Sequence, residues 1–262
     1  MWRKDLIFVR SNCEGFRSIS EGFRSAGFKI IAGIDNDSFA FDTYSKNFAE
    51  AVAIEKDLSE VSTNGRSVIS DLLNHKIDVI IGGPPCQGFS IAGKHLKDDP
   101  RNKLYRAYLA LIRQLEPKAI IVENVPTITS LFKGEIAKQI KEDFVSLGFN
   151  TEVFTLLASD YGVPQNRKRT FFVGLKGKKK YKIPGPTTAF TKITTEMALS
   201  DLPLLETELG GDELDYDKAP QNDYQMMIRR KSKKIYNHWA VEHKDQTKKI
   251  IKLVPDGGNY KD

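Results

Sequence analysis

Short apolar runs alternate with longer amphipathic stretches over roughly the first 150 residues of the chain. The runs Lys29–Ile34, Ile77–Ile81 and Lys118–Val122 are continuous and rich in β-branched residues. Such runs are typical of strands in a parallel sheet that is covered on both faces. Two later runs, Val153–Leu157 and Thr170–Val173, predict further strands that can pair through the loop between them.

Two of the longer stretches have apolar residues at helical spacing. The first runs from Leu104 to Leu115 and should end before Pro117, because proline cannot continue a helix. The second runs from Ile136 to Leu147, with Gly148 as its C-cap. Strands that alternate with helices of this length favour an α/β fold with a doubly wound, mostly parallel sheet.

The composition changes after Gly174. A lysine-rich stretch at 176–182 is followed by Pro184-Gly185-Pro186, which breaks regular structure. The remainder is polar, with an acidic segment at 206–217 and a basic segment at 229–234, and could be a small domain or a partly ordered extension. We therefore expect one sheet domain over residues 1–174 and a partial second domain over residues 175–262.

Length, charge and cysteine content exclude only a few classes of protein. The 262 residues, 40% of them hydrophobic, suffice for one core with a smaller appendage. The net charge of +6 permits a phosphate-rich partner, although a solvated basic surface would explain it equally well. No apolar run is long enough to span a membrane, no signal peptide is visible, and only Cys13 and Cys86 are cysteines. These features predict a reduced, cytoplasmic protein. The four histidines lack metal-ligand spacing, so we expect no metal site.

Ligands of open parallel sheets bind beyond the carboxyl ends of the strands. Asp35 follows the first run and could accept hydrogen bonds from ribose hydroxyls, or it could cap a helix, a role for which Asp37 competes. Cys86 follows the second run, in the loop Pro84–Ser90, whose two prolines and glycine would present a thiol rigidly. A thiolate is a strong nucleophile, whereas a lone cysteine is more often a small buried residue; the rigid loop favours the first reading.

Two further groups carry candidate chemistry. Glu123 follows the third run, where an apolar environment could make its carboxyl group an acid, although a capping or turn role is the commoner one. Arg167 and Arg169 alternate along an extended segment and can therefore face the same side. Guanidinium groups bind phosphate or carbonyl oxygens in a fixed geometry, but a solvated basic turn is also common.

Taken in series, these blocks resemble the cytosine-5 DNA methyltransferase family. The Pro-Cys-Gln, Glu-Asn-Val and Gln-x-Arg-x-Arg blocks are highly specific in this order, and the match covers about two thirds of the chain. The resemblance implies a Rossmann-like methyltransferase fold, with catalysis and cofactor binding in residues 1–174 and the start of a target-recognition region in residues 175–262. The matching segments are Ser20–Phe28, Gly33–Asp37, Lys56–Leu58, Pro84–Ser90, Asp99–Leu104, Glu123–Val125 and Tyr161–Gly174.

The resemblance also implies a role for each site residue. Cys86 would attack C6 of a cytosine flipped out of double-stranded DNA, and Glu123 would hydrogen-bond and protonate N3. Arg169 would hold the base oxygen, and Arg167 would support the loop. The methyl donor would be S-adenosylmethionine, leaving S-adenosylhomocysteine, and the setting a restriction-modification system. The residues expected to bind the cofactor are Asp35, Asn36, Asp57, Leu58, Pro84 and Leu104.

The chain departs from the family pattern in two places. The stretch Val9–Ile19 is longer than the family's glycine-rich loop and contains one glycine, so we hypothesise a local insertion or frameshift that would weaken cofactor binding. Near the end, Asn237-His238 and Val254–Tyr260 resemble the segment that leads into the target-recognition domain, and the chain stops at Asp262. We therefore expect a truncated product or a second polypeptide that supplies the remainder, and weak or no activity from the isolated chain.

Two other functions stay open from the sequence. A tRNA cytosine-5 methyltransferase shares the same catalytic blocks, and the region that would discriminate DNA from tRNA lies beyond them. A non-catalytic remnant that binds only DNA or a partner chain is the third possibility. Cofactor binding separates this remnant from the two enzymes, and comparison of DNA with tRNA as substrates separates the enzymes from each other.

Overall fold

The computed structural model divides the chain into two compact units, residues 1–158 with 167–186 and residues 159–166 with 187–262. The prediction that catalysis and target recognition divide at residue 174 stays a prediction. Each unit is considered by itself. The structure describes residues 5–9, 16–58, 72, 75–84, 103–177, 182–188, 190–205, 210–230, 232–255 and 258, with only the backbone at 7–9 and 16–18.

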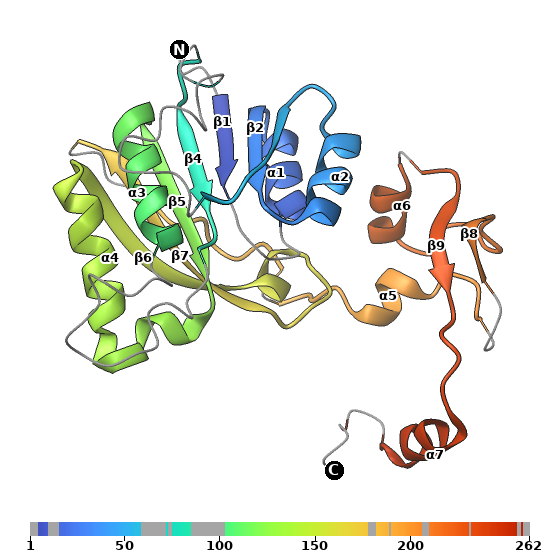
Figure 1. Cartoon of the computed structure of the whole chain (residues 1–262). Coiled ribbons are helices and arrows are strands. Elements are labelled where there is room, and N and C mark those ends of the chain that lie inside the picture. The colour runs from blue at the N-terminus through green and yellow to red at the C-terminus, as the bar shows by residue number, and fades with distance from the viewer. Residues whose placement is uncertain are drawn as a thin grey trace. The chain divides into compact units, whose positions relative to one another are not determined.

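A seven-stranded sheet in the order β3-β2-β1-β4-β5-β7-β6 forms the centre of the first unit (Figure 1). The first five strands are parallel, and β7 lies antiparallel between β5 and β6. This arrangement confirms the predicted doubly wound, mostly parallel sheet. The strands are β1 (Asp5–Val9), β2 (Lys29–Asp35), β3 (Val52–Glu55), β4 (Val79–Gly82), β5 (Ala119–Asn124), β6 (Phe149–Leu157) and β7 (Lys168–Lys176).

Helices cover both faces of this sheet because successive strand side chains point to opposite faces. Val79 and Ile81 belong to a buried cluster that includes Tyr44 and Phe48 at the end of α2. Ile80, between them, belongs to a second cluster built with α3 and α4. Among the described residues of this unit, the α-helices are α1 (Phe16–Ser25), α2 (Ser38–Asn47), α3 (Lys103–Leu115) and α4 (Glu135–Ser146). The short 3-10 turns η5 (Pro126–Thr129) and η6 (Leu131–Gly134) lie between β5 and α4, and η7 (Ala158–Tyr161) follows β6 and leads into the second unit.

The predicted elements are confirmed, with some shifted ends. Helix α3 ends at Leu115, and Gly148 follows α4 with a φ of 84°, as a left-handed C-cap requires. Strand β6 begins at Phe149, four residues earlier than the apolar run indicates. In this unit the sequence pattern did not predict β1, α1, α2 or β3. Among the described residues of α2 only Tyr44 is buried, and β3 is a short strand at the edge of the sheet, so neither carries a strong apolar period.

The second unit contains small elements around a partly polar interior. Gln225 is fully buried, and its amide donates to the hydroxyl of Ser200. Arg229 pairs with the buried Asp201, and its guanidinium lies 3.4 Å from the ring centroid of Tyr216. The elements are α5 (Thr195–Leu199), α6 (Asp223–Arg229), α7 (Asp245–Leu253) and the antiparallel pair β8 (Gly210–Leu214) and β9 (Ile235–Trp239). Within the described ranges, no helix has the length and apolar character needed to cross a bilayer.

Candidate active site at the carboxyl edge of the sheet

The order in which strands are added to the sheet reverses between the neighbouring parallel strands β1 and β4. Strand β1 pairs with β2 on one side and with β4 on the other, so the first half of the sheet grows one way and the second half the other way. A crevice for ligands opens outside the carboxyl ends of the strands at such a switch point. Asp35, Pro84 and Glu123 stand at the carboxyl ends of β2, β4 and β5, and the structure therefore brings these three predicted site residues to one edge of the sheet.

An ion pair joins Glu123 to Arg169. The Nε atom of Arg169 lies 3.0 Å from Oε1 of Glu123, and the two side chains are 24% and 12% exposed. The register explains the contact: Glu123 lies opposite Phe171 on β7, and Arg169 is the diagonal neighbour two residues away on the same face. The pair therefore places a carboxyl and a guanidinium group side by side at the strand ends, where both can reach one polar ligand.

The next residue, Asn124, ties the end of β5 to the loop that follows β4. Its buried side chain donates from Nδ2 to the carbonyl oxygen of Pro84 at 2.9 Å, and its Oδ1 accepts from the backbone N–H of Val125. Pro84 precedes Cys86 by two residues. Cys86 itself lies outside the described residues, as does the rest of 85–102, so the structure fixes the start of the cysteine loop beside Glu123 without placing the thiol.

Close packing of Tyr108 against Gly82 fixes the end of β4 from the other side. A Cβ atom at Gly82 would lie only 2.6 Å from Cε2 of the tyrosine ring, so no larger residue fits without a shift. The Tyr108 hydroxyl lies 3.1 Å from the carbonyl oxygen of Ile121 and 3.3 Å from that of Ile80, and burial raises its pKa well above the usual range. The apolar pattern does not predict this contact, and its one signal in the sequence is the glycine pair Gly82-Gly83 at the end of the strand.

The residues expected to bind the cofactor differ in exposure. Asp35 is 1% exposed, and its Oδ1 accepts from the N–H of Asp37 at 3.1 Å. Asp37 is the N-cap of α2, where its Oδ1 accepts from Ala40 N at 2.8 Å, so the capping role belongs to Asp37. A carboxylate at the end of β2, beside the switch point, fits the hydroxyls of a ribose. Of the others, Leu58 and Pro84 are buried, Asp57 and Leu104 are half-buried, and Asn36 is exposed.

Arg167 is more exposed than Arg169 and is held by its backbone. Its side chain is exposed, and its carbonyl oxygen accepts from the N–H of Ala158 at 2.9 Å. This bond closes the base of the loop between β6 and β7. The structure thus brings Arg169 to Glu123 and anchors Arg167 by its backbone, one residue before β7 begins.

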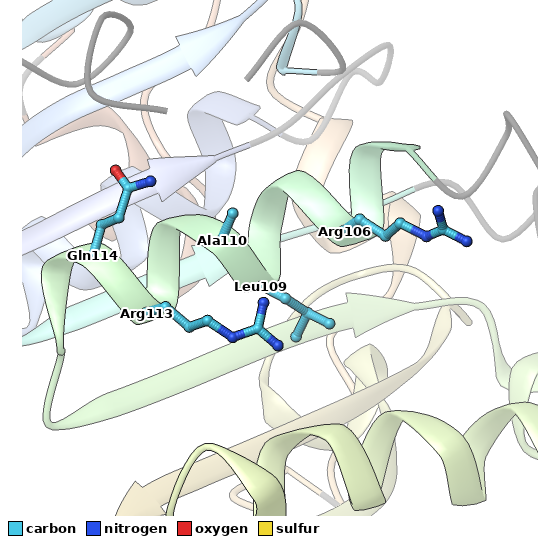
Figure 2. A pocket seen from close by; sticks show the side chains of 5 residues that line it. All are labelled: Arg106, Leu109, Ala110, Arg113 and Gln114. Carbon is cyan, nitrogen blue, oxygen red and sulfur yellow. The ribbon is translucent and has the colours of Figure 1, made fainter. Parts of the chain in front are cut away.

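A separate hollow of about 250 Å³ runs along α3 (Figure 2). Its lining residues recur at helical spacing, so they form one stripe of the helix surface. None of them is a predicted site residue, and we do not assign the active site to this hollow. They are Arg106, Leu109, Ala110, Arg113 and Gln114.

Comparison with known proteins gives a consistent family. The family model described as C-5 cytosine-specific DNA methylase matches residues 10–261. Type II methyltransferase M.DdeI of Desulfomicrobium norvegicum is 36% identical over 248 residues, which are 91% of this chain and 58% of that protein. Type II methyltransferase M1.HphI of Haemophilus parahaemolyticus is 31% identical over 252 residues, 95% of this chain and 61% of that protein. The chain therefore spans about three fifths of these curated relatives.

A solved structure agrees with the sequence relatives. It is the crystal structure of an Escherichia coli prophage protein described as a DNA modification methyltransferase. The TM-score is 0.75 at 26% sequence identity, and the match covers 95% of this chain and 75% of that one. The Rossmann-like fold expected from the sequence is thereby confirmed.

Proposed function

Because this chain belongs to the C-5 cytosine-specific DNA methylase family, we propose that it transfers a methyl group from S-adenosylmethionine to carbon 5 of cytosine in double-stranded DNA. The observation that carries the proposal is the Glu123–Arg169 pair, which stands at the edge where the loop towards Cys86 begins. Restriction-modification is the proposed setting, since the relatives are described as Type II methyltransferases. The comparisons give no support to a second polypeptide, which stays a prediction.

The chemistry needs a nucleophile and an acid. Carbon 5 of cytosine is too weak a nucleophile to take a methyl group unaided. Addition of the Cys86 thiolate to C6 breaks the C5–C6 double bond and, with a proton shared between Glu123 and N3, leaves an enamine between C4 and C5 in which C5 is electron-rich. The bound S-adenosylmethionine supplies an electrophilic methyl group to C5. Loss of the C5 proton then restores the double bond and expels the Cys86 thiolate.

In this scheme the guanidinium group of Arg169 can bind either Glu123 or the oxygen of the cytosine base. Without substrate its guanidinium pairs with Glu123. A guanidinium also binds a carbonyl oxygen in fixed geometry. We propose that Arg169 turns partly to the base oxygen when cytosine binds, which leaves Glu123 to share its proton with N3. Arg167, on the loop side of β7, supports the same segment.

Cofactor binding is assigned to the other end of the crevice. The buried Asp35 would accept hydrogen bonds from the two ribose hydroxyls, and Asn36 would lie beside the adenine. Asp57 and Leu58 would contact the adenine edge, with Leu104 beside them. Pro84 would support the cofactor at the start of the cysteine loop. The target cytosine must leave the DNA stack to meet this crevice, because its C6 is unreachable within the duplex.

The test is methyl transfer from labelled S-adenosylmethionine to mixed-sequence duplex DNA and, in parallel, to tRNA, with cofactor binding measured by calorimetry. The proposal expects 5-methylcytosine in the DNA, abolished in Glu123→Gln. Methylation of tRNA alone would replace it with the tRNA function. Absence of both cofactor binding and methyl transfer would identify a non-catalytic remnant. Robust turnover would also contradict the expectation of weak activity from the isolated chain.

A further inference from the structure

The loop between β6 and β7 is held by a segment that follows it by about 25 residues. The hydroxyl of Thr188 donates to the carbonyl oxygen of Ser159 at 2.9 Å and accepts from the N–H of Gly162 at 2.8 Å. One side chain thus bridges both ends of the turn 159–162. Ser159 is 4% exposed and Gly162 and Thr188 are half-buried, so both bonds are partly shielded from water.

Three further contacts hold the same turn. The backbone N–H groups of Thr187 and Thr188 both donate to the carbonyl oxygen of Asp160 at 2.9 Å. The carboxylate of Asp160 forms an ion pair with Lys192. Thr187 and Thr188 therefore satisfy backbone groups of the turn, and Lys192 pairs with the side chain of its Asp160.

The turn leads directly to the arginines. The loop leaves β6 through Ala158 and returns at Arg167, where the N–H of Ala158 donates to the Arg167 carbonyl oxygen. Apart from the bonds of the 3-10 turn, the backbone hydrogen bond described inside this loop runs from the N–H of Gln165 to the carbonyl oxygen of Val163. Gly162 has a φ of 82°, in the left-handed region. The path of the backbone into Arg167 thus depends on how the turn 159–162 is anchored.

We infer that Thr188, assisted by Lys192, is a positioning residue that orders the loop carrying Arg167 and thereby sets how the arginine segment meets the substrate. Its effect should be stronger on Arg167 than on Arg169, because Arg169 is also held by pairing with Leu156 across β6 and β7. This inference rests on the proposed function for its kinetic consequence but not for its structural one.

The test compares Thr188→Val with Thr188→Ser, which keeps the hydroxyl, and with Thr187→Val, the same change at the exposed neighbouring threonine. Amide hydrogen exchange is followed at Gly162, which bonds to Thr188, and at Ala158, which bonds to Arg167. We expect Thr188→Val to speed exchange at both amides by about tenfold or more, the factor that corresponds to about 1.4 kcal/mol. The two control variants should stay within about twofold of the wild type.

Methyl transfer to duplex DNA supplies the functional readout. We expect Thr188→Val to lower kcat/KM about tenfold, mainly through a higher KM for DNA, with unchanged affinity for S-adenosylmethionine and rescue by Thr188→Ser. Lys192→Met, which removes only the ion pair to Asp160, should shift both readouts the same way by a smaller factor. It serves as the second variant should Thr188→Val fail to fold.

Three outcomes would overturn the inference. The first is faster exchange at Gly162 with no change at Ala158, since the anchor would then not reach Arg167. The second is a fall in kcat alone with KM for DNA unaltered. The third is an equal effect from Thr187→Val. Should the wild type transfer no methyl group, the proposed function fails, and the exchange at Ala158 alone decides whether Thr188 orders the loop.

Discussion

The Nε atom of Arg169 on β7 lies 3.0 Å from the Oε1 atom of Glu123 on β5. The two residues are 46 positions apart in the sequence, and the contact exists because β7 enters the sheet antiparallel beside β5. Both side chains are mostly shielded from water, so their attraction is less screened than that of a surface pair. The carboxyl group proposed to act on cytosine N3 is thus held in place before any substrate arrives.

Glu123→Gln should abolish most methyl transfer. Glutamine preserves the shape of the side chain but cannot share its proton with N3 as an acid, and general acid catalysis typically contributes 10²- to 10⁴-fold in rate. We expect kcat for DNA methylation to fall by at least about a hundredfold, while the far-ultraviolet circular dichroism spectrum stays that of the wild type.

The control for this change is Glu142→Gln on α4, an exposed residue paired only with Lys138 among the contacts the structure describes. It should keep wild-type kcat. Equal activity of Glu123→Gln and the wild type would remove Glu123 from the mechanism.

Asn124→Asp should destabilise the protein by about 1–3 kcal/mol, because a carboxylate cannot donate to the carbonyl oxygen of Pro84 and leaves it without that bond. Unfolding in urea, followed by circular dichroism, measures the change. Asn47→Asp is the matched control, since the Asn47 amide also donates to a carbonyl oxygen but is exposed. A similar small effect from both variants would mean that the buried bond contributes little.

Gly82→Ala should destabilise the protein by about 1–3 kcal/mol through overpacking against the ring of Tyr108. Tyr108→Phe should not relieve it, because the clash involves the ring carbons Cε2 and Cδ2 and not the hydroxyl. Thermal unfolding gives the comparison. Gly185→Ala is the control, as no atom lies within 4 Å of its added Cβ, and it should leave the unfolding temperature unchanged.

The buried Tyr44 should make the protein sensitive to alkali. Burial raises its pKa to about 12 from the ordinary 10.0, so the folded state keeps the phenol proton that the unfolded state releases above about pH 10. The stabilisation that the protonated Tyr44 phenol gives the folded state is therefore fully present below pH 10. This part of the free energy of unfolding is lost as the pH rises towards 12, at up to about 1.4 kcal/mol per pH unit.

Tyr44→Phe keeps the ring, which lies 4.6 Å from that of Phe48, and removes the titrating group. Between pH 10 and pH 11 the free energy of unfolding should therefore fall more for the wild type than for this variant. The same change at the exposed Tyr236 provides the control. A difference that does not vary with pH would contradict the assignment.

The sheet could be predicted from the sequence because its inner strands are buried on both faces and so appear as unbroken apolar runs. Ile80 and Ile120 illustrate this, since each is fully buried. Helix α2 and strand β3 could not be predicted in the same way, because α2 has Tyr44 as its buried described residue and β3 lies at an edge.

The sequence could predict which residues belong to the site, but it could not predict which of them contact one another. Glu123 and Arg169 each stand in a recognisable block, but their pairing requires β7 to insert between β5 and β6, an order that the run of strands along the chain does not reveal. The bond from Asn124 to Pro84 likewise depends on two neighbouring parallel strands ending at the same level. Thr188 gave no signal in the sequence, because its partners are backbone atoms of a distant loop.

The central claim is that the thiol of Cys86 adds to C6 of cytosine. Duplex DNA with 5-fluorocytosine tests it directly, because fluorine at C5 cannot leave as a proton does and the adduct is trapped after methylation. With S-adenosylmethionine present, mass spectrometry should find a methylated covalent complex attached at Cys86, present also in Cys13→Ser and absent in Cys86→Ser. A complex that survives in Cys86→Ser, or DNA methylated at C5 without any covalent complex, would contradict the account.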